Sequence, residues 1–488
     1  MNKNECEIFT QVCIIGGGTA GMAAAYALKD TGYRVVLVEK ESTLGGTAVN
    51  AWVETWIAGI NPPYLKEILC KDFKMSEKDL SKIILPKMFS KVYKEGDSSS
   101  IYLSRQKLGG IYLRDMTAAA NIQLMCGYRF LDACMKDSRI KSVRIQNTND
   151  SGDIKEITAD YFIDATGNGD LAAYNGSLDI DYYLGEDPYD RFDETLAPKS
   201  QLKQQERISC LNEPSLFFCV AGSGSNDAIN RCTSGIPEKY RISATSDFRY
   251  DGYNKGCWVN PMTGMNISGW AVVDAGEEYV YGKAKEQVGN YWTFIQEEVE
   301  RRLKEGKDLY GYNKNVLSQY PTGECASMLG IRETRRIACK YMLRQKDLAI
   351  TESAAFLGRD IAMGSHDIDF HVYGHLSQNA IGKFNNEELR PSGIPYDCMI
   401  PLRFRNLLVA CRSYGASHIA LAARRVNKDM AQLGWAAGKA FAWCLDRGFN
   451  ACDTSDVDVV ELQSTAYTGF KDEVEYMENH LLKEEYKR

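Results

Sequence analysis

The distribution of apolar residues predicts a chain that alternates between strands and helices. Short apolar runs predict strands, and apolar residues at three- and four-residue spacing predict helices. The predicted strands of the first and last parts of the chain lie at 12–15, 34–39, 122–126, 128–135, 142–145, 161–164 and 406–410. The predicted helices lie at about 19–31, 108–120, 281–305 and 425–446. This alternation places the chain in the α/β class.

The strand at 12–15 leads into a glycine-rich turn that contains Gly16, Gly18 and Gly21. The next strand ends in Glu39, eighteen positions after the last of these glycines. This is the strand–turn–helix–strand pattern of a dinucleotide-binding fold. The first glycine permits the tight turn, the second lets the backbone approach a pyrophosphate, and the third lets helix and strand pack closely. The helix N-terminus favours the phosphate charge, and Glu39 would accept hydrogen bonds from an adenosine ribose.

A second glycine turn follows the strand at 161–164, where Gly167, Gly169 and Ala172 fit the pattern G-x-G-x-x-A. One interpretation is a second nucleotide site, for NAD(P)H. No strand that ends in an acid follows about twenty residues later, because 186–207 is polar and contains proline. The favoured interpretation is that this turn returns to the same sheet, beside the first dinucleotide site.

Changes in composition divide the chain into four parts. Residues 1–185 form the first part of a dinucleotide-binding domain, with a lysine-rich helical excursion at 65–107 and a hairpin tip at 147–153. Residues 186–390 are predicted to form an inserted α+β substrate domain, with strands at 216–221 and around 257–274. Residues 391–450 return to the first domain with a strand and a helix, and 451–488 form a helical tail.

Composition and charge narrow the function classes. The 488 residues carry a formal net charge of −7, which argues against nucleic acid as a partner. No apolar run reaches membrane-spanning length, so no membrane partner is expected. The 15 cysteines are scattered without metal-binding spacing, and the polar first ten residues predict no signal peptide, so we expect reduced thiols and a cytoplasmic protein. A homo-oligomer is compatible with the sequence, but no pattern predicts it.

With both glycine turns and the final strand and helix, the chain resembles the FAD-dependent oxidoreductase family of the glutathione-reductase-like Rossmann superfamily. The likeness is strongest at 14–21, 39–47, 164–171, 329–336 and 406–438. It implies an FAD-binding Rossmann-type domain built from discontinuous segments. One departure concerns the end of the last strand, where many such flavoproteins have Gly-Asp. Here the residues are Ala410, Cys411 and Arg412.

The resemblance also implies where FAD would bind. The first turn would hold the pyrophosphate, through Gly16, Gly18, Thr19, Ala20 and Gly21. The end of the second strand would hold the adenosine ribose, through Glu39 and Lys40. A further glycine turn, formed by Gly45, Gly46 and Thr47, would lie along the ribityl–phosphate chain. The turn after the strand at 161–164 would lie beside the adenosine; it consists of Ala165, Thr166 and Gly167. The start of the last helix, at Arg425 and Val426, would approach the pyrimidine edge of the flavin.

The sequence lacks two arrangements found in related flavoproteins: a CxxxxC pair in the helix after the first turn, and a complete second NAD(P) domain. We therefore expect an FAD-dependent oxidoreductase, a dehydrogenase or reductase that moves a hydride between flavin N5 and a small organic substrate, with a histidine as general acid/base. The electron donor or acceptor stays open. The alternatives are a flavin monooxygenase and a non-catalytic flavin-binding sensor.

Two histidines are candidates for the acid/base group. His418 lies between the last predicted strand and its helix, where the resembling family has a histidine followed seven residues later by an arginine, here Arg425. It is the first candidate. His371 is the second, because a strand at 365–371 would put it on one face with Asp369, which would raise its basicity. Both histidines have structural alternatives, as a loop cap or a loop-fixing hydrogen bond. A metal site from His366, His371 and His375 is disfavoured by its spacing, so no metal is expected.

Three arginines, Arg332, Arg335 and Arg336, have the spacing of one helix face. On a helix such a run is often a solvated surface. The apolar residues that precede it, together with the resemblance, favour an inward position for Arg335. It would then face an anionic substrate group or the N1–C2 region of the reduced flavin.

Overall fold

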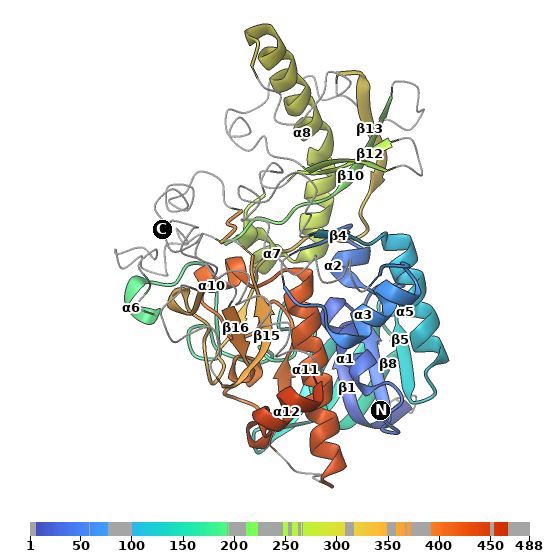
Figure 1. Cartoon of the computed structure of the whole chain (residues 1–488), viewed down its shortest axis with the longest axis vertical. Coiled ribbons are helices and arrows are strands. Elements are labelled where there is room, and N and C mark those ends of the chain that lie inside the picture. Colours follow the sequence, from blue (N-terminus) through green and yellow to red (C-terminus); the bar gives the residue numbers. More distant parts are fainter. Residues whose placement is uncertain are drawn as a thin grey trace.

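The computed structural model describes residues 6–57, 59–76, 100–192, 194, 211–222, 247–251, 256–261, 265, 267–307, 317–348, 358–366, 368–371, 392–448 and 453–466. These residues form a large body built on a mainly parallel sheet. A smaller unit of strands and one long helix projects from one end of this body (Figure 1). No helix among the described residues is long and apolar enough to cross a membrane.

The main sheet has seven strands, in the order β5-β2-β1-β8-β7-β6, and β17 pairs with the end of β8. Its strands are β1 (Cys6–Ile15), β2 (Val35–Glu39), β5 (Ile122–Cys126), β6 (Tyr128–Lys136), β7 (Arg139–Asn147), β8 (Ile154–Asp164) and β17 (Leu407–Val409). β1, β2, β5, β8 and β17 are parallel, whereas β6 and β7 are antiparallel. In the register, Ile15 pairs with Asp164, and Asp164 pairs with Val409. The carboxyl ends of strands far apart in sequence therefore meet at one edge, where open α/β sheets bind ligands.

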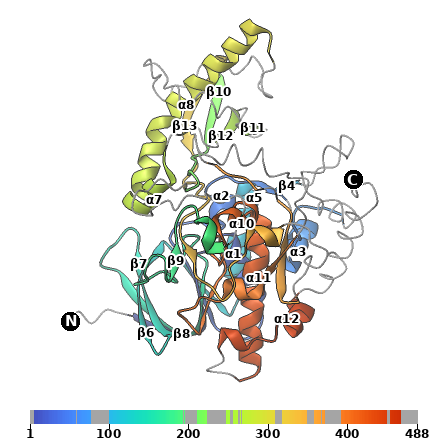
Figure 2. The same cartoon turned by 90° about the vertical axis from the view of Figure 1, so that its left-hand side faces the viewer.

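Two helices from opposite ends of the chain pack together against this sheet. They are α1 (Thr19–Leu28) and α11 (Asn427–Asp446), and the pair makes one of the most extensive helix contacts in the molecule. Small residues allow the close approach, since a side chain at Gly434 would collide with the carbonyl oxygen of Ala20. Figure 2 shows α11 and α12 (Val459–Ala466) on the side of the molecule away from β6 and β7.

The projecting unit has its own core. An antiparallel sheet in the order β11-β12-β10-β13 comprises β10 (Phe218–Gly222), β11 (Asp247–Asp251), β12 (Gly256–Asn260) and β13 (Gln319–Cys325). Next to it lie α7 (Gly269–Ala275) and the long α8 (Glu277–Glu305). Phe218 meets Tyr291 and Trp292 of α8 edge-on, at ring-centroid distances of 6.2 and 6.1 Å. This core is separate from the one around the main sheet.

The remaining elements are short and connect or cover the two cores. They are α2 (Gly46–Val49), β3 (Thr55–Ile57), α3 (Pro63–Lys71), β4 (Ser100–Tyr102), α5 (Arg105–Ala118), β9 (Tyr182–Tyr183), α6 (Tyr189–Phe192), β14 (Arg336–Ile337), β15 (Asp360–Gly364), β16 (Ser392–Pro395), α10 (His418–Ala423) and three 3₁₀ turns at 345–348, 396–399 and 454–456.

The α/β class and the discontinuous Rossmann-type sheet are confirmed, because β1, α1 and β2 are joined by strands from both ends of the chain.

The expected strands around 257–274 are only partly right. Residues 269–275 form helix α7, and Ser268 caps its start, because the Ser268 side chain accepts a hydrogen bond from the Trp270 N–H at 3.2 Å. In the 65–107 excursion, α3, β4 and the start of α5 are described and 77–99 lie outside the described residues. In the tail, α12 is helical and 467–488 lie outside. The four domain boundaries stay predictions.

Candidate active site

A cavity of about 1570 Å³ opens at the carboxyl ends of the parallel strands. Its wall combines the turn after β1, the end of β2, the turn after β8, the start of α11 and residues of the projecting unit. The volume exceeds the roughly 300–1,000 Å³ of a typical pocket for one drug-sized ligand. The cavity therefore has room for a large cofactor together with a second molecule.

The glycine turn after β1 forms one wall of the cavity. Gly16 has a φ of +106°, a conformation that side chains rarely adopt. A side chain at Gly21 would lie 1.7 Å from the carbonyl oxygen of Gly16, so this position keeps α1 against β1. A side chain at Gly18 would approach only the Cα of Gly46, at 3.8 Å, and would otherwise project into open space. Gly18 is also the N-cap of α1, with no capping side chain, so the first N–H groups of the helix are available to an anion.

The end of β2 supplies the acidic group of the turn. Glu39 is buried and lines the cavity, and it accepts hydrogen bonds from the N–H of Gly17 at 2.7 Å and of Glu41 at 2.8 Å. Burial raises the pKa of Glu39, and the two backbone donors partly oppose this rise. Lys40, the next residue, forms an ion pair with Glu277 at the first position of α8. The projecting unit therefore contacts the cavity wall next to Glu39, through the ion pair between Lys40 and Glu277.

The second glycine turn lies against the first. Gly45 has a φ of +109°, and its N–H donates to the carbonyl oxygen of Gly17 at 2.8 Å. Gly18 and Gly45 form an isolated parallel bridge, and Gly46 and Thr47 line the cavity. The two turns thus form one continuous backbone cradle.

The turn after β8 forms the third side of the cradle, where Ala165, Thr166 and Gly167 line the cavity. Asp164 holds this turn, because its carboxylate accepts from the Thr166 N–H at 3.1 Å and the Ala172 N–H at 2.8 Å. Because β8 lies between β1 and β17, the turn returns to the same sheet beside the first glycine turn. Sequence reasoning favoured this interpretation over a second nucleotide site.

Arg412 occupies the position where the sequence departs from Gly-Asp. Its Nη2 donates to the Asn168 side-chain oxygen at 2.6 Å, and its guanidinium lies so close to Gly167 that a side chain there would collide with it. Arg412 lines the cavity and forms no ion pair within the described ranges. Together, the open cradle, the uncapped helix terminus and this cation suit a dinucleotide that carries a pyrophosphate.

His371 lines the same cavity and contacts Asp369, with 2.6 Å between His371 Nε2 and Asp369 Oδ2. Its backbone N–H donates to the Asn212 side chain at 2.8 Å. Burial lowers the pKa of His371, the charge of Arg332 lowers it further, and Asp369 only partly compensates, which leaves the pKa at about 4. The expected strand at 365–371 is wrong, because β15 ends at Gly364. The contact forms in an irregular segment, which the Arg425 Nη2 holds by donating to the Asp369 carbonyl oxygen at 2.9 Å.

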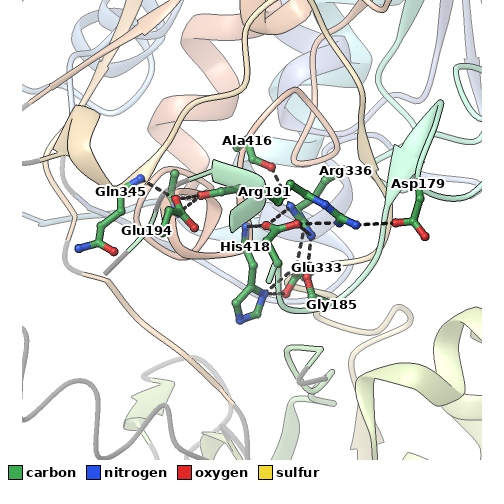
Figure 3. Close-up of polar contacts among 12 residues, drawn as sticks. Asp179, Gly185, Arg191, Glu194, Glu333, Arg336, Gln345, Ala416 and His418 are labelled. Carbon is green, nitrogen blue, oxygen red and sulfur yellow. Dashed lines mark hydrogen bonds and ion pairs between the residues drawn. The ribbon is translucent and has the colours of Figure 1, made fainter. Parts of the chain in front are cut away.

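His418 lies outside the cavity lining, at the start of α10 and 2% exposed. Its Nδ1 lies 2.9 Å from the Glu333 carboxylate, and its ring stacks on Phe370 with a centroid distance of 5.0 Å. Burial would lower the pKa of His418, but the Glu333 charge raises it overall. Figure 3 shows the His418 ring at the edge of a buried ionic cluster that also contains Arg336.

The three arginines do not share a helix face, because residues 332–335 are irregular and β14 begins at Arg336. That expectation is wrong. Arg336 is fully buried, with an ion pair to Asp187 at 2.7 Å and another to Glu333 at 3.2 Å. Arg335 lines the cavity and pairs with Asp170 at 2.9 Å. Arg332 also lines the cavity.

Sequence reasoning missed the acids that hold these groups, chiefly Glu333 and Asp187. Glu333 lies inside the arginine run, and an acid between basic residues was a signal of a buried ionic cluster. No local signal marked Asp187, whose partner Arg336 is 149 positions away. Among the described residues, no group of three histidine, cysteine, aspartate or glutamate side chains has a metal-binding arrangement. His375 lies outside the described residues.

Comparison with known proteins identifies the family. The profile of a family described as FAD dependent oxidoreductase matches residues 11–465. The chain belongs to the FAD-dependent oxidoreductase family. FAD is therefore its cofactor, and the glycine cradle, Glu39 and Arg412 fit the adenosine and pyrophosphate of that molecule.

Individual relatives match this FAD-dependent oxidoreductase over limited stretches. Dihydrolipoyl dehydrogenase from Haemophilus influenzae is 50% identical over 44 residues, which is 9% of this chain and 9% of that protein. Thiamine thiazole synthase from Methanococcus aeolicus is 24% identical over 268 residues, 54% of this chain and 84% of that protein. Among solved structures, a geranylgeranyl bacteriochlorophyll reductase-like protein from Thermoplasma acidophilum is 10% identical, with a TM-score of 0.40, and the match covers 94% of this chain and 83% of that one. The matches at 50% identity or more thus span less than a tenth of each relative's length.

Replacing Arg336 by Met is expected to destabilise the protein by about 3–5 kcal/mol, because it removes the buried cation that lies between Asp187 and Glu333. Of the ionic contacts among the described residues, Asp187 would then keep only its ion pair with Arg191, and Glu333 only its contact with His418. Urea unfolding followed by circular dichroism measures the change. The matched control is Arg301→Met, since Arg301 pairs with Glu298 and Glu305 on the exposed face of α8 and should have little effect. Equal stabilities of the two variants would contradict the role assigned to the cluster.

The low pKa of His371 predicts a stability that depends on pH. Unfolded histidine has a pKa of about 6.5, so between pH 6.5 and 4 the unfolded chain binds more protons than the folded one. Stability from the neutral His371 is fully present above pH 6.5 and is lost as the pH falls toward 4, by on the order of 3 kcal/mol. In His371→Gln, the melting temperature should fall less steeply over this range. If the melting temperatures of the wild type and of His371→Gln fell in parallel with pH, His371 would not titrate in this way.

Proposed function

We propose that this FAD-dependent oxidoreductase is a dehydrogenase or reductase that moves a hydride between FAD and a small organic substrate, with His371 as general acid/base. The observation that carries the proposal is the His371–Asp369 pair, which lines the same cavity as the glycine cradle. When bound, FAD supplies hydride exchange at N5. The protein must then bind the substrate, orient it and move one proton.

His371 is suited to the proton step. With its pKa lowered to about 4, the imidazole is neutral at pH 7. When Nε2–H donates to the Asp369 carboxylate, Nδ1 carries the free lone pair, and Nδ1 has no hydrogen-bond partner among the described residues. Nδ1 would therefore accept the proton of a substrate hydroxyl during oxidation, or return a proton during reduction.

His418 serves the proposed site indirectly. Its ring stacks on Phe370, the neighbour of His371, and Glu333 fixes its Nδ1. The Asn212 side chain accepts from the His371 backbone and donates to Glu333 at 2.6 Å. A buried network therefore supports the segment that presents His371, and we assign His418 the role of a positioning residue.

Stopped-flow reoxidation tests the proposal. The purified protein is loaded with FAD, photoreduced without oxygen and mixed with panels of ketones, enoates, quinones and oxygen. Reoxidation by ketones or enoates, lost in His371→Gln while FAD is retained, is the expected result. Rapid NAD(P)H oxidation with oxygen-dependent hydroxylation would indicate a monooxygenase instead. Reoxidation by no small molecule would indicate a flavin-binding sensor.

A further inference from the structure

Two arginines reach the cavity beside His371 from separate segments. Arg332 belongs to the irregular segment before β14, and Arg425 lies two residues before α11. Both line the cavity together with His371 and Asp369. A backbone carbonyl holds each guanidinium, since Arg332 Nη1 donates to the Glu213 oxygen at 2.8 Å and Arg425 Nη2 donates to the Asp369 oxygen at 2.9 Å.

The protein supplies few carboxylates to these two cations. The Asp369 carboxylate lies 3.5 Å from Arg425, but it also contacts His371 at 2.6 Å. Arg332 forms no ion pair within the described parts of the chain, although the Asp369 and Glu213 charges lie near enough to act on it. Burial and the neighbouring charge of Arg425 lower the pKa of Arg332 to about 10, which still leaves it positive at pH 7.

Hydrogen-bond donors remain available on both guanidiniums. Within the described residues, only the Glu213 carbonyl oxygen accepts from Arg332, which leaves most of its five N–H groups for a ligand. The Arg425 Nε is buried without a partner among the same residues. Arginine is the residue best suited to planar recognition of a carboxylate, because two parallel N–H groups match its two oxygens. By contrast, Arg335, which also lines the cavity, is occupied by Asp170.

We propose that the substrate is a small organic carboxylate whose carboxylate group binds Arg332 and Arg425, with the reacting carbon beside His371. This inference rests on the function proposed above and names its substrate class. The sequence predicted an anion-binding role for Arg335 and a contact with the pyrimidine edge of the flavin for Arg425. The substrate carboxylate is assigned instead to Arg332 and Arg425, which both line the cavity. Anion binding would also neutralise two charges that lower the basicity of His371, so the bound carboxylate would make the histidine a better proton acceptor.

Matched ligand pairs test this inference on the FAD-loaded protein. Lactate with lactamide, and glycolate with glycolamide, differ in the carboxylate alone, and inorganic phosphate serves as a competing anion. Binding is followed by the flavin absorbance difference and by thermal shift, without any turnover. We expect each carboxylate to bind at least about tenfold more tightly than its amide. Arg332→Met should weaken carboxylate binding about 10–100-fold and leave the amides and the flavin spectrum unchanged.

Two further variants keep the test interpretable. Arg332→Lys retains the charge and should recover part of the carboxylate affinity, whereas the exposed control Arg301→Met should bind like the wild type. Equal binding of carboxylates and amides, or wild-type carboxylate affinity in Arg332→Met, would overturn the inference. Tighter binding of phosphate than of any carboxylate would also overturn it. Because none of these readouts requires hydride transfer, each result is independent of the reoxidation experiment that tests the function itself.

Discussion

Replacing Gly18 by Ala is expected to leave the protein folded and to weaken FAD binding at least about tenfold, equivalent to about 1.4 kcal/mol. The backbone at Gly18 is extended, with φ of −72°, which any residue adopts. An added methyl group would touch only the Gly46 Cα, at 3.8 Å, and would otherwise enter the cradle where the backbone must approach the pyrophosphate. FAD titration followed by flavin fluorescence measures the affinity, and the melting temperature of the FAD-free protein reports folding.

Gly21→Ala is the matched variant, with the same change three residues later. Its methyl group would lie 1.7 Å from the Gly16 carbonyl oxygen, so α1 would have to move from β1. We expect this variant to lose stability even without FAD. An FAD-free Gly18→Ala protein as unstable as Gly21→Ala would show that the Gly18 position serves packing rather than the cofactor.

Replacing His371 by Gln is expected to slow hydride exchange with the substrate by about 10²–10⁴-fold, the range that a positioned acid/base group contributes. FAD should stay bound, because the hydrogen bonds of His371 among the described residues are to Asp369, Asn212 and Glu213, and none is to the three turns that form the cradle. Single-turnover reduction or reoxidation of the flavin, with a substrate found by the panels above, measures the rate. Asp369→Asn should slow the same step less, since the imidazole keeps its lone pair but loses its orienting carboxylate.

The comparison with His418→Gln separates the two histidines. His418 is the stronger candidate from sequence, but its ring lies outside the cavity lining and is held by Glu333. We expect its replacement to slow the reaction moderately, to lower the melting temperature and to keep the pH profile of the wild type. A loss in His418→Gln as large as in His371→Gln, with unchanged stability, would return the acid/base role to His418.

The cofactor side of the site was largely predictable from the sequence, because it depends on local patterns. Gly16, Gly18 and Gly21 mark a glycine turn that spans only six residues. Glu39 follows eighteen positions after Gly21, which is the length of chain needed for one helix and the next strand. The structure places the residues expected in the three turns and at the end of β2 in or directly beneath one cradle, with Gly21 and Gly45 in its packing layer. Arg425 and Val426 line the cavity at the start of α11, and the contacts of all these residues with FAD stay predictions.

The substrate side was less predictable, because it depends on contacts between distant segments. The spacing of Arg332 and Arg336 fits a helix, but residues 332–335 are irregular, and Arg336 begins β14, which pairs with β9. The Arg336 side chain lies in a buried ionic cluster with Asp187. The partners of His418 and Arg336 lie 85 and 149 positions away, and periodicity carries no information over such separations. For the same reason, the proximity of Arg332 to Arg425 was not foreseeable.

The packing of α1 against α11 also constrains how the protein is made. The first glycine turn leaves the ribosome hundreds of residues before the helix that completes its site, since α1 ends at Leu28 and α11 begins at Asn427. Domains generally fold as units during synthesis, and contacts of such long sequence separation form late because loop closure costs entropy. The nascent amino-terminal half would expose its alanine-rich helix face until α11 has been synthesised. FAD loading is therefore expected to follow the synthesis of α11, and truncation before α11 should yield chains that depend on chaperones.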